Sequence, residues 1–173
     1  MLRTLTPIGL GGAVALALAA SSGGVASAAS ACTPGQLRAK MAVIRGSAGA
    51  GNIEYRVLLR NASTATCTVS GRVGLRLRGA HGQNLPTHVT AVPPGSLGVL
   101  VTLAPGRSAA ATVRFSPDVP GPGESAMGPC ERTAHTVRVT LASPGSGSLI
   151  GPISPATAVC EHGGMSETNL SRV

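Results

Sequence analysis

The chain has 173 residues, of which 43% are hydrophobic and 12% are charged, and its net charge is +8 with histidine neutral. This hydrophobic content excludes an intrinsically disordered chain, because disorder requires low hydrophobicity together with high net charge. With one tyrosine, one phenylalanine and no tryptophan, the chain lacks the exposed aromatic rings on which modules for carbohydrate or single-stranded nucleic acid stack their ligands.

Residues 1–28 are predicted to be a secretory signal peptide. Arg3 gives a charged start, an apolar stretch runs from Leu5 to Ala20, and Ala26-Ser27-Ala28 supplies the small residues that signal peptidase requires. The stretch is shorter than the roughly 20 apolar residues of a spanning helix, so we expect cleavage and no transmembrane span in the mature form. The leucine that a lipoprotein site carries three residues before its cysteine is missing ahead of Cys32, which argues against lipid anchoring. The expected location is therefore secreted or associated with the cell wall.

Residues 29–173 have the length of one domain. Without Arg3 this part carries 13 basic and 6 acidic residues, a net charge of +7. Such a domain is attracted to anionic wall or lipid surfaces by a field that salt screens.

The elements expected in this domain are β-strands. Weaker strands are predicted at Leu37 to Ile44, Val89 to Val92, Val99 to Leu103 and Ile153 to Cys160. Clear strands show apolar residues alternating with polar ones, the period that buries one face of a sheet; their inward residues are Ile53, Tyr55, Val57 and Leu59, then Val73, Leu75 and Leu77, then Ala109, Ala111, Val113 and Phe115, then Val137, Val139 and Leu141. Both aromatic residues are thus predicted to fill the core.

Glycine and proline pairs separate these strands at short intervals, and Ser116 to Pro129 is expected to be a long surface loop. Many short alternating strands with such turns predict an all-β fold, an immunoglobulin-like β-sandwich of about seven to nine strands.

The four cysteines predict two disulfides, because an even count in an exported chain is typical of a disulfide framework. Three pairings are possible, and we predict the sequential one, Cys32 with Cys67 and Cys130 with Cys160. Each such loop would stabilise the fold by roughly 3 to 4 kcal/mol. A zinc site on the cysteines is not expected, since structural zinc ligands come as closely spaced pairs.

Three segments together resemble a known family: Arg60-Asn61 through Cys67-Thr68-Val69-Ser70-Gly71, Leu103-Ala104-Pro105-Gly106 with the strand Ser108 to Phe115, and Val159-Cys160-Glu161-His162-Gly163-Gly164. Their order and spacing are similar to those of actinobacterial exported domains known as domain of unknown function 4232. One departure is Val73, where the family often has proline. The resemblance runs from Cys32 to about Leu170 and implies an immunoglobulin-type sandwich, but it transfers no catalytic residue.

No catalytic, cofactor or metal site is expected. The histidines, His81, His88, His135 and His162, have no metal-ligand spacing. Asp118 is the only aspartate, and no Gly-x-Ser-x-Gly elbow occurs. The sole lysine, Lys40, lacks the neighbouring glycine and the serine or threonine of a phosphate-binding loop.

Asn61 and Asn169 begin glycosylation triplets, but Asn61 is expected to close a strand end.

One feature stands out, an outward row of arginines. Arg56 and Arg60 on one predicted strand and Arg72, Arg76 and Arg78 on the next would line one sheet face if the two strands were neighbours. The simple interpretation is a solvated sheet face. The functional interpretation is a docking surface for an anionic envelope polymer, a lipid headgroup or an acidic protein, because guanidinium groups match phosphate and carboxylate.

The sequence thus predicts a non-enzymatic exported binding or interaction domain at the cell envelope, without a cofactor, without a specific nucleic-acid partner and with an unknown ligand. The alternative is a secreted hydrolase or an enzyme inhibitor with an unrecognised site. A concave pocket with convergent polar groups would favour this alternative.

Overall fold

A computed structural model describes residues 29–142 and 145–173, and the expected signal peptide, 1–28, lies outside these residues. The described part is an all-β structure, as predicted. Its elements in chain order are η1 (Pro34–Gln36), β1 (Leu37–Val43), β2 (Ile53–Asn61), β3 (Cys67–Val69), β4 (Val73–Arg78), β5 (His88–Val92), β6 (Val101–Leu103), β7 (Ser108–Phe115), β8 (Ala134–Leu141), β9 (Ser148–Thr157), α1 (Cys160–Gly163), β10 (Gly164–Thr168) and β11 (Ser171–Arg172). None of its helices is long and apolar enough to cross a membrane.

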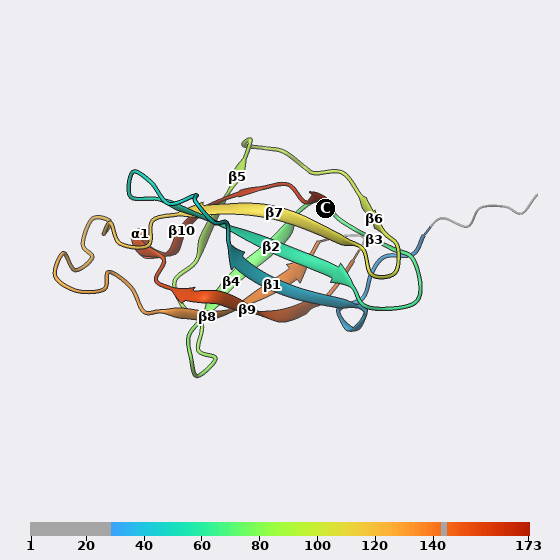
Figure 1. The fold of residues 1–173 in the computed structure, drawn as a ribbon, viewed down its shortest axis with the longest axis horizontal. Coiled ribbons are helices and arrows are strands. Elements are labelled where there is room, and N and C mark those ends of the chain that lie inside the picture. Colours follow the sequence, from blue (N-terminus) through green and yellow to red (C-terminus); the bar gives the residue numbers. More distant parts are fainter. Residues whose placement is uncertain (1–28, 143–144) are drawn as a thin grey trace, which may run out of the picture.

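Two halves of one long sheet make up the sandwich. The strand order is β4-β8-β9-β1-β2-β7-β10-β5, with β11 paired to β7, and Figure 1 shows β9, β1, β2 and β7 following one another across the molecule. β9 joins the halves, because its first part pairs with β8 while Ile153 and Ser154 pair with β1. A separate two-stranded sheet, β3 with β6, closes one end.

The core lies between the two halves and follows the predicted alternation. Tyr55, Val57 and Leu59 of β2 belong to the same buried cluster as Leu77 of β4 and Val137 of β8. The rings of Tyr55 and Phe115 are 5.2 Å apart between centroids. Their inward placement is confirmed, since Tyr55 is 1% and Phe115 is 2% exposed.

The two disulfides have the predicted pairing. Cys32–Cys67 ties the segment before η1 to β3, and Cys130–Cys160 ties the chain ahead of β8 to α1. The long loop predicted at residues 116–129 is also confirmed, because no helix or strand lies between β7 and β8.

The two ends of the described chain lie at the same end of the sandwich. Ala31 pairs with Thr68, and Arg172 pairs with Ala109 at the start of β7. In Figure 1 the C-terminus lies toward one end of the long axis and α1 toward the other.

The described part holds eleven strands instead of the expected seven to nine. β3 and β11 are too short to show a period of two. β10 has a charged residue, Glu167, at an inward position where an alternating pattern requires an apolar residue. The sequence therefore did not predict this strand. β9 ends at Thr157 instead of continuing to Cys160.

Glu167 is an unusual core residue. It is 3% exposed and lies opposite Val113 and Ala91 of the neighbouring strands. Its Oε1 has no hydrogen-bond partner. Burial raises the pKa of this carboxyl to about 7, against the opposing attraction of Arg72, because desolvation disfavours the charged form.

Replacing Glu167 by Gln should therefore change how stability depends on pH. In the parent, the folded carboxyl holds its proton up to about pH 7, whereas the unfolded one loses it near 4.5, so the free energy of unfolding falls between these two values and is level above them. Glu167→Gln should remove this fall and be more stable at pH 8 by on the order of 2 to 3 kcal/mol. Urea unfolding from pH 4 to pH 8 measures both effects.

Glu54→Gln on the outward side of β2 is the control for removing a carboxyl, and it should keep the fall in stability that Glu167 causes between pH 4.5 and 7. A parent whose stability does not fall between pH 4.5 and 7 would contradict the raised pKa of the buried Glu167 carboxyl.

Candidate functional site

The structure does not bring the five predicted arginines together. β2 lies between β1 and β7, whereas β4 is at the edge of the sheet and pairs with β8. The expected single face of Arg56, Arg60, Arg72, Arg76 and Arg78 is therefore wrong. Consecutive strands are often neighbours, but here the chain passes through β3 and enters the other half of the sandwich before it forms β4.

The three arginines at β4 have separate surroundings. Arg76 is exposed and lies opposite Arg138 of β8. Arg72 donates from Nη1 to the carbonyl of Ser96 at 2.9 Å, and Arg78 is half-buried. Arg76 and Arg78 share the outward side of β4, whereas Arg72 is held at the Ser96 carbonyl.

The other two arginines belong to a different group of cations, which we call the basic face. It consists of outward residues on three adjacent strands: Arg38 and Lys40 of β1, Arg56 and Arg60 of β2, and Arg114 of β7. Arg38 lies directly opposite Arg60, and Arg56 lies between Ala42 and Thr112. Alternation places them there, because their neighbours along each strand point into the core.

The positive charge of the basic face is nearly uncompensated by acidic residues. Glu54 is its one acidic residue, opposite Arg114. In residues 29–142 and 145–173, the ion pairs within 4.0 Å all involve His162, so none of these cations has a carboxylate partner there. The other acidic residues are the buried Glu167 and a group in the 116–133 loop and α1: Asp118, Glu124, Glu131 and Glu161.

A groove of about 340 Å³ lies on the basic face, beside the end of β1. Three cations line it, Lys40, Arg45 and Arg56, over the apolar side chains of Ala42, Ile44 and Leu58. Guanidinium groups donate in a planar fork that fits a phosphate or a carboxylate, while an ammonium acts as a point charge. The groove can therefore hold an anionic group with a short nonpolar segment beside it.

At the opposite end of β2, Asn61 connects two of the sequence motifs. Asn61 is completely buried, and its Nδ2 donates to the carbonyls of Ala65 at 2.8 Å and Leu103 at 2.9 Å. Its Oδ1 accepts from the backbone and hydroxyl of Ser63. Its own carbonyl accepts from Gly106 N at 2.9 Å. The segment from Asn61 to Cys67 and the turn from Leu103 to Gly106 are thus one hydrogen-bonded unit. The expected role of Asn61 at a strand end is confirmed.

The third motif forms a left-handed turn at α1. Glu161 and His162 have φ values of 56° and 55°, and Gly163 has 78°. Only glycine adopts such angles at no steric cost. A Cβ on Gly163 would lie 2.1 Å from the carbonyl oxygen of Pro86, so this position requires glycine on two grounds.

Residues 32–170 match the model of a protein family described as a domain of unknown function (DUF4232). The chain belongs to the DUF4232 family. Searches of curated proteins and of solved structures gave no match.

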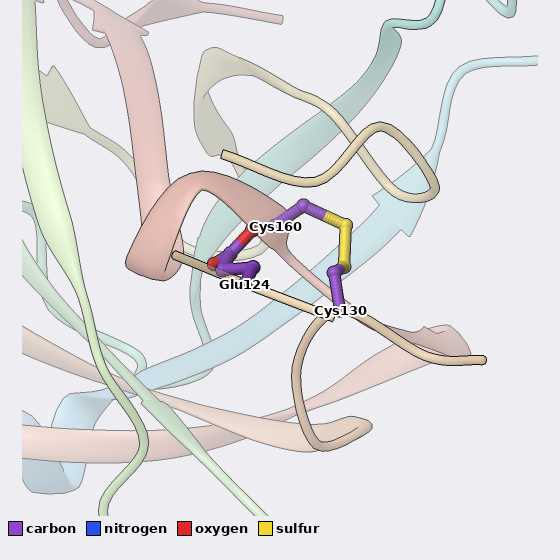
Figure 2. Close-up of side chains that lie close together, drawn as sticks. All are labelled: Glu124, Cys130 and Cys160. Carbon is purple, nitrogen blue, oxygen red and sulfur yellow. A yellow bond between two sulfur atoms is a disulfide. The ribbon is translucent and has the colours of Figure 1, made fainter. Parts of the chain in front are cut away.

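In this DUF4232 domain the left-handed turn is held by a carboxylate from the long loop. Glu124 Oε2 accepts from the backbone N–H groups of Gly121 at 2.6 Å and Glu161 at 2.8 Å, and Oε1 accepts from that of His162. Figure 2 shows the Glu124 side chain beside the Cys130–Cys160 disulfide, under the α1 turn. Burial alone would raise the pKa of Glu124, but the backbone donors and the ring of His162 lower it overall. The turn is therefore supported by an ionised carboxylate.

Sequence reasoning missed Glu124, since nothing in the spacing of a loop glutamate shows that it will meet a turn 37 residues away. His81, His88 and His135 are exposed and belong to no group of three metal-ligating residues in the described part of the chain. His162 differs, because it lies beside Glu124 and Glu131.

Replacing Asn61 by Ala should destabilise the DUF4232 domain strongly. The change leaves the buried carbonyl of Leu103 and the N–H of Ser63 without their partners, and each lost partner of this kind costs roughly 1 to 3 kcal/mol. We expect a loss of about 2 to 4 kcal/mol in the free energy of unfolding, measured by urea denaturation.

Asn84→Ala is the matched control, because Asn84 is exposed and should change stability by less than about 0.5 kcal/mol. Equal stability of the two variants would show that the Asn61 amide does not organise this end of the domain.

Proposed function

We propose that this protein is an exported, non-enzymatic domain that binds an anionic polymer of the cell envelope through its basic face. The observation that carries the proposal is a set of five outward cations on three adjacent strands, none of them paired with a carboxylate in the described part of the chain. Such a surface attracts and orients a polyanion.

A polymer suits this surface better than a small ligand does. Outward residues two apart on a strand are separated by about 6.6 Å, and adjacent strands by about 4.8 Å, so the cations form a band instead of converging on one point. Small-molecule sites enclose most of their ligand, whereas the groove beside Arg56 is bounded by strand residues on an open sheet face. A chain of repeated phosphates could contact several of these cations together.

Lys40, Arg45 and Arg56 would form the strongest part of the contact. They surround one groove, where a phosphate could accept from more than one donor at once. Arg38 and Arg60 would extend the contact along the sheet, because they lie directly opposite each other. Exposed contacts of this kind are weak singly and sensitive to salt.

Export supports the same proposal. The expected signal peptide and the two disulfides both suit an oxidising compartment outside the cytoplasm. A net positive domain released there would meet anionic envelope material directly.

Mass spectrometry of the protein recovered from its secreting host tests the export step. We expect an N-terminus near Ala29 and a mass lower by two hydrogens for each of the two disulfides than after reduction. An acylated Cys32, or an intact residue 1–28 segment, would contradict it.

Removing four cations of the basic face should abolish salt-sensitive binding to poly(glycerol phosphate), used as the probe polymer. The variant carries Gln at Arg38, Lys40, Arg56 and Arg60. Its thermal stability should remain close to that of the parent, because exposed strand positions contribute only tenths of a kcal/mol. Binding is measured by titration at low and high salt.

A second quadruple variant controls for net charge. It carries Gln at four exposed arginines elsewhere, Arg76, Arg107, Arg132 and Arg172. Equal loss in both variants would show that only total charge matters. Titration with phosphatidylglycerol vesicles tests a lipid headgroup as the partner, and titration with polyglutamate tests an acidic protein. Tighter binding to either of these than to the polymer would overturn the choice of partner.

A further inference from the structure

The acidic corner beside α1 holds three metal-ligating side chains. They are Glu124 from the long loop, Glu131 next to Cys130, and His162 two residues after Cys160. The Cys130–Cys160 disulfide connects the segments that carry Glu131 and His162, and the backbone donors of α1 fix the Glu124 carboxylate. The three side chains are therefore preorganised by the fold.

Distances within this group suit an ion between the side chains better than direct hydrogen bonds. His162 Nδ1 lies 3.6 Å from Glu124 Oε1 and 3.8 Å from Glu131 Oε1. Charge-assisted hydrogen bonds between such groups measure about 2.7 to 2.9 Å. Ligand atoms around a tetrahedral zinc ion are about 3.3 Å apart, given metal distances near 2.0 to 2.1 Å. Small side-chain movements would bring the three atoms to that spacing.

The orientation of the His162 ring supports the same interpretation. Its Nε2 lies 3.0 Å from the carbonyl oxygen of Pro122, and a carbonyl can only accept, so Nε2 carries the proton. In a neutral ring the lone pair is then on Nδ1, which faces the two carboxylates. Metal-bound histidines commonly donate their other ring nitrogen to a backbone carbonyl in this way.

Both carboxylates have lone pairs to offer. Glu124 Oε2 already accepts two backbone N–H groups, but Oε1 accepts one and keeps a second lone pair. Among the described residues, the Glu131 side chain accepts no hydrogen bond. The exposed fraction of the side chain is 2% for Glu124, 19% for Glu131 and 55% for His162, so one side of the group is open to water.

We propose that Glu124 Oε1, Glu131 Oε1 and His162 Nδ1 bind one divalent zinc ion, with water in the remaining position. The mixed nitrogen and oxygen ligands favour Zn²⁺, whereas Mg²⁺ and Ca²⁺ prefer oxygen ligands, and more of them. Asp118 and Glu161 lie in the same loop and turn but outside the three-residue group. The ion would connect the 116–133 loop to α1 beside the disulfide.

Zinc titration of the oxidised, chelator-treated protein tests this site. We expect one Zn²⁺ per chain by calorimetry. Glu131→Gln and His162→Asn should each weaken binding by at least about tenfold, since even an indirect partner of a ligand contributes that much. Asn is chosen at position 162 because it tolerates the left-handed backbone there.

Glu161→Gln is the matched control, with the same change in charge in the same turn but outside the three-residue group, and it should keep the affinity of the parent. In nitrogen NMR spectra the His162 Nδ1 signal should move on adding zinc, while the signals of His81, His88 and His135 stay in place. Absence of zinc binding, undiminished binding by the first two variants, or a shift at another histidine instead would each overturn the proposal.

Discussion

The hydrogen bonds of the buried Asn61 amide are the interaction on which the arrangement of the strands depends. Asn61 ends the central strand β2, and it fixes the turn toward β3 and the turn between β6 and β7. Those turns determine where Cys67 meets Cys32 and where β7 begins its pairing with β2. The described core holds one contact between aromatic rings. Because large side chains are few, packing contributes little to where these turns and strands lie. Hydrogen bonds and disulfides therefore determine their positions.

Local patterns were sufficient to predict most of this fold. Alternation along β2, β4, β7 and β8 correctly identified the inward residues, because each of these strands buries one face. The disulfide pairing also followed from the sequence. β10 could not be found in this way, since Glu167 occupies a core position that only its neighbours in space explain.

The sites were harder to predict because they depend on which strands meet. Alternation showed that Arg56 and Arg76 point outward, but it could not show that they lie in different halves of the sandwich. The same limit applies to Glu124 and His162, which come from a loop and a turn far apart in the chain. Their contact depends on the left-handed turn and on the disulfide beside it. The pairing of the cysteines was predicted, but nothing local showed that a loop carboxylate would meet this turn.

Both ends of the described chain lie beside the Asn61 end of the sandwich, while α1 lies at the far end. A linker, a tag or a fused domain attached at either end would therefore point away from the Glu124 corner. The basic face runs lengthwise between the two ends, on the outward side of β1, β2 and β7. A molecule lying flat on an anionic layer would keep its attachment point and its acidic corner free on opposite sides, so immobilisation through either end leaves both surfaces accessible to solution.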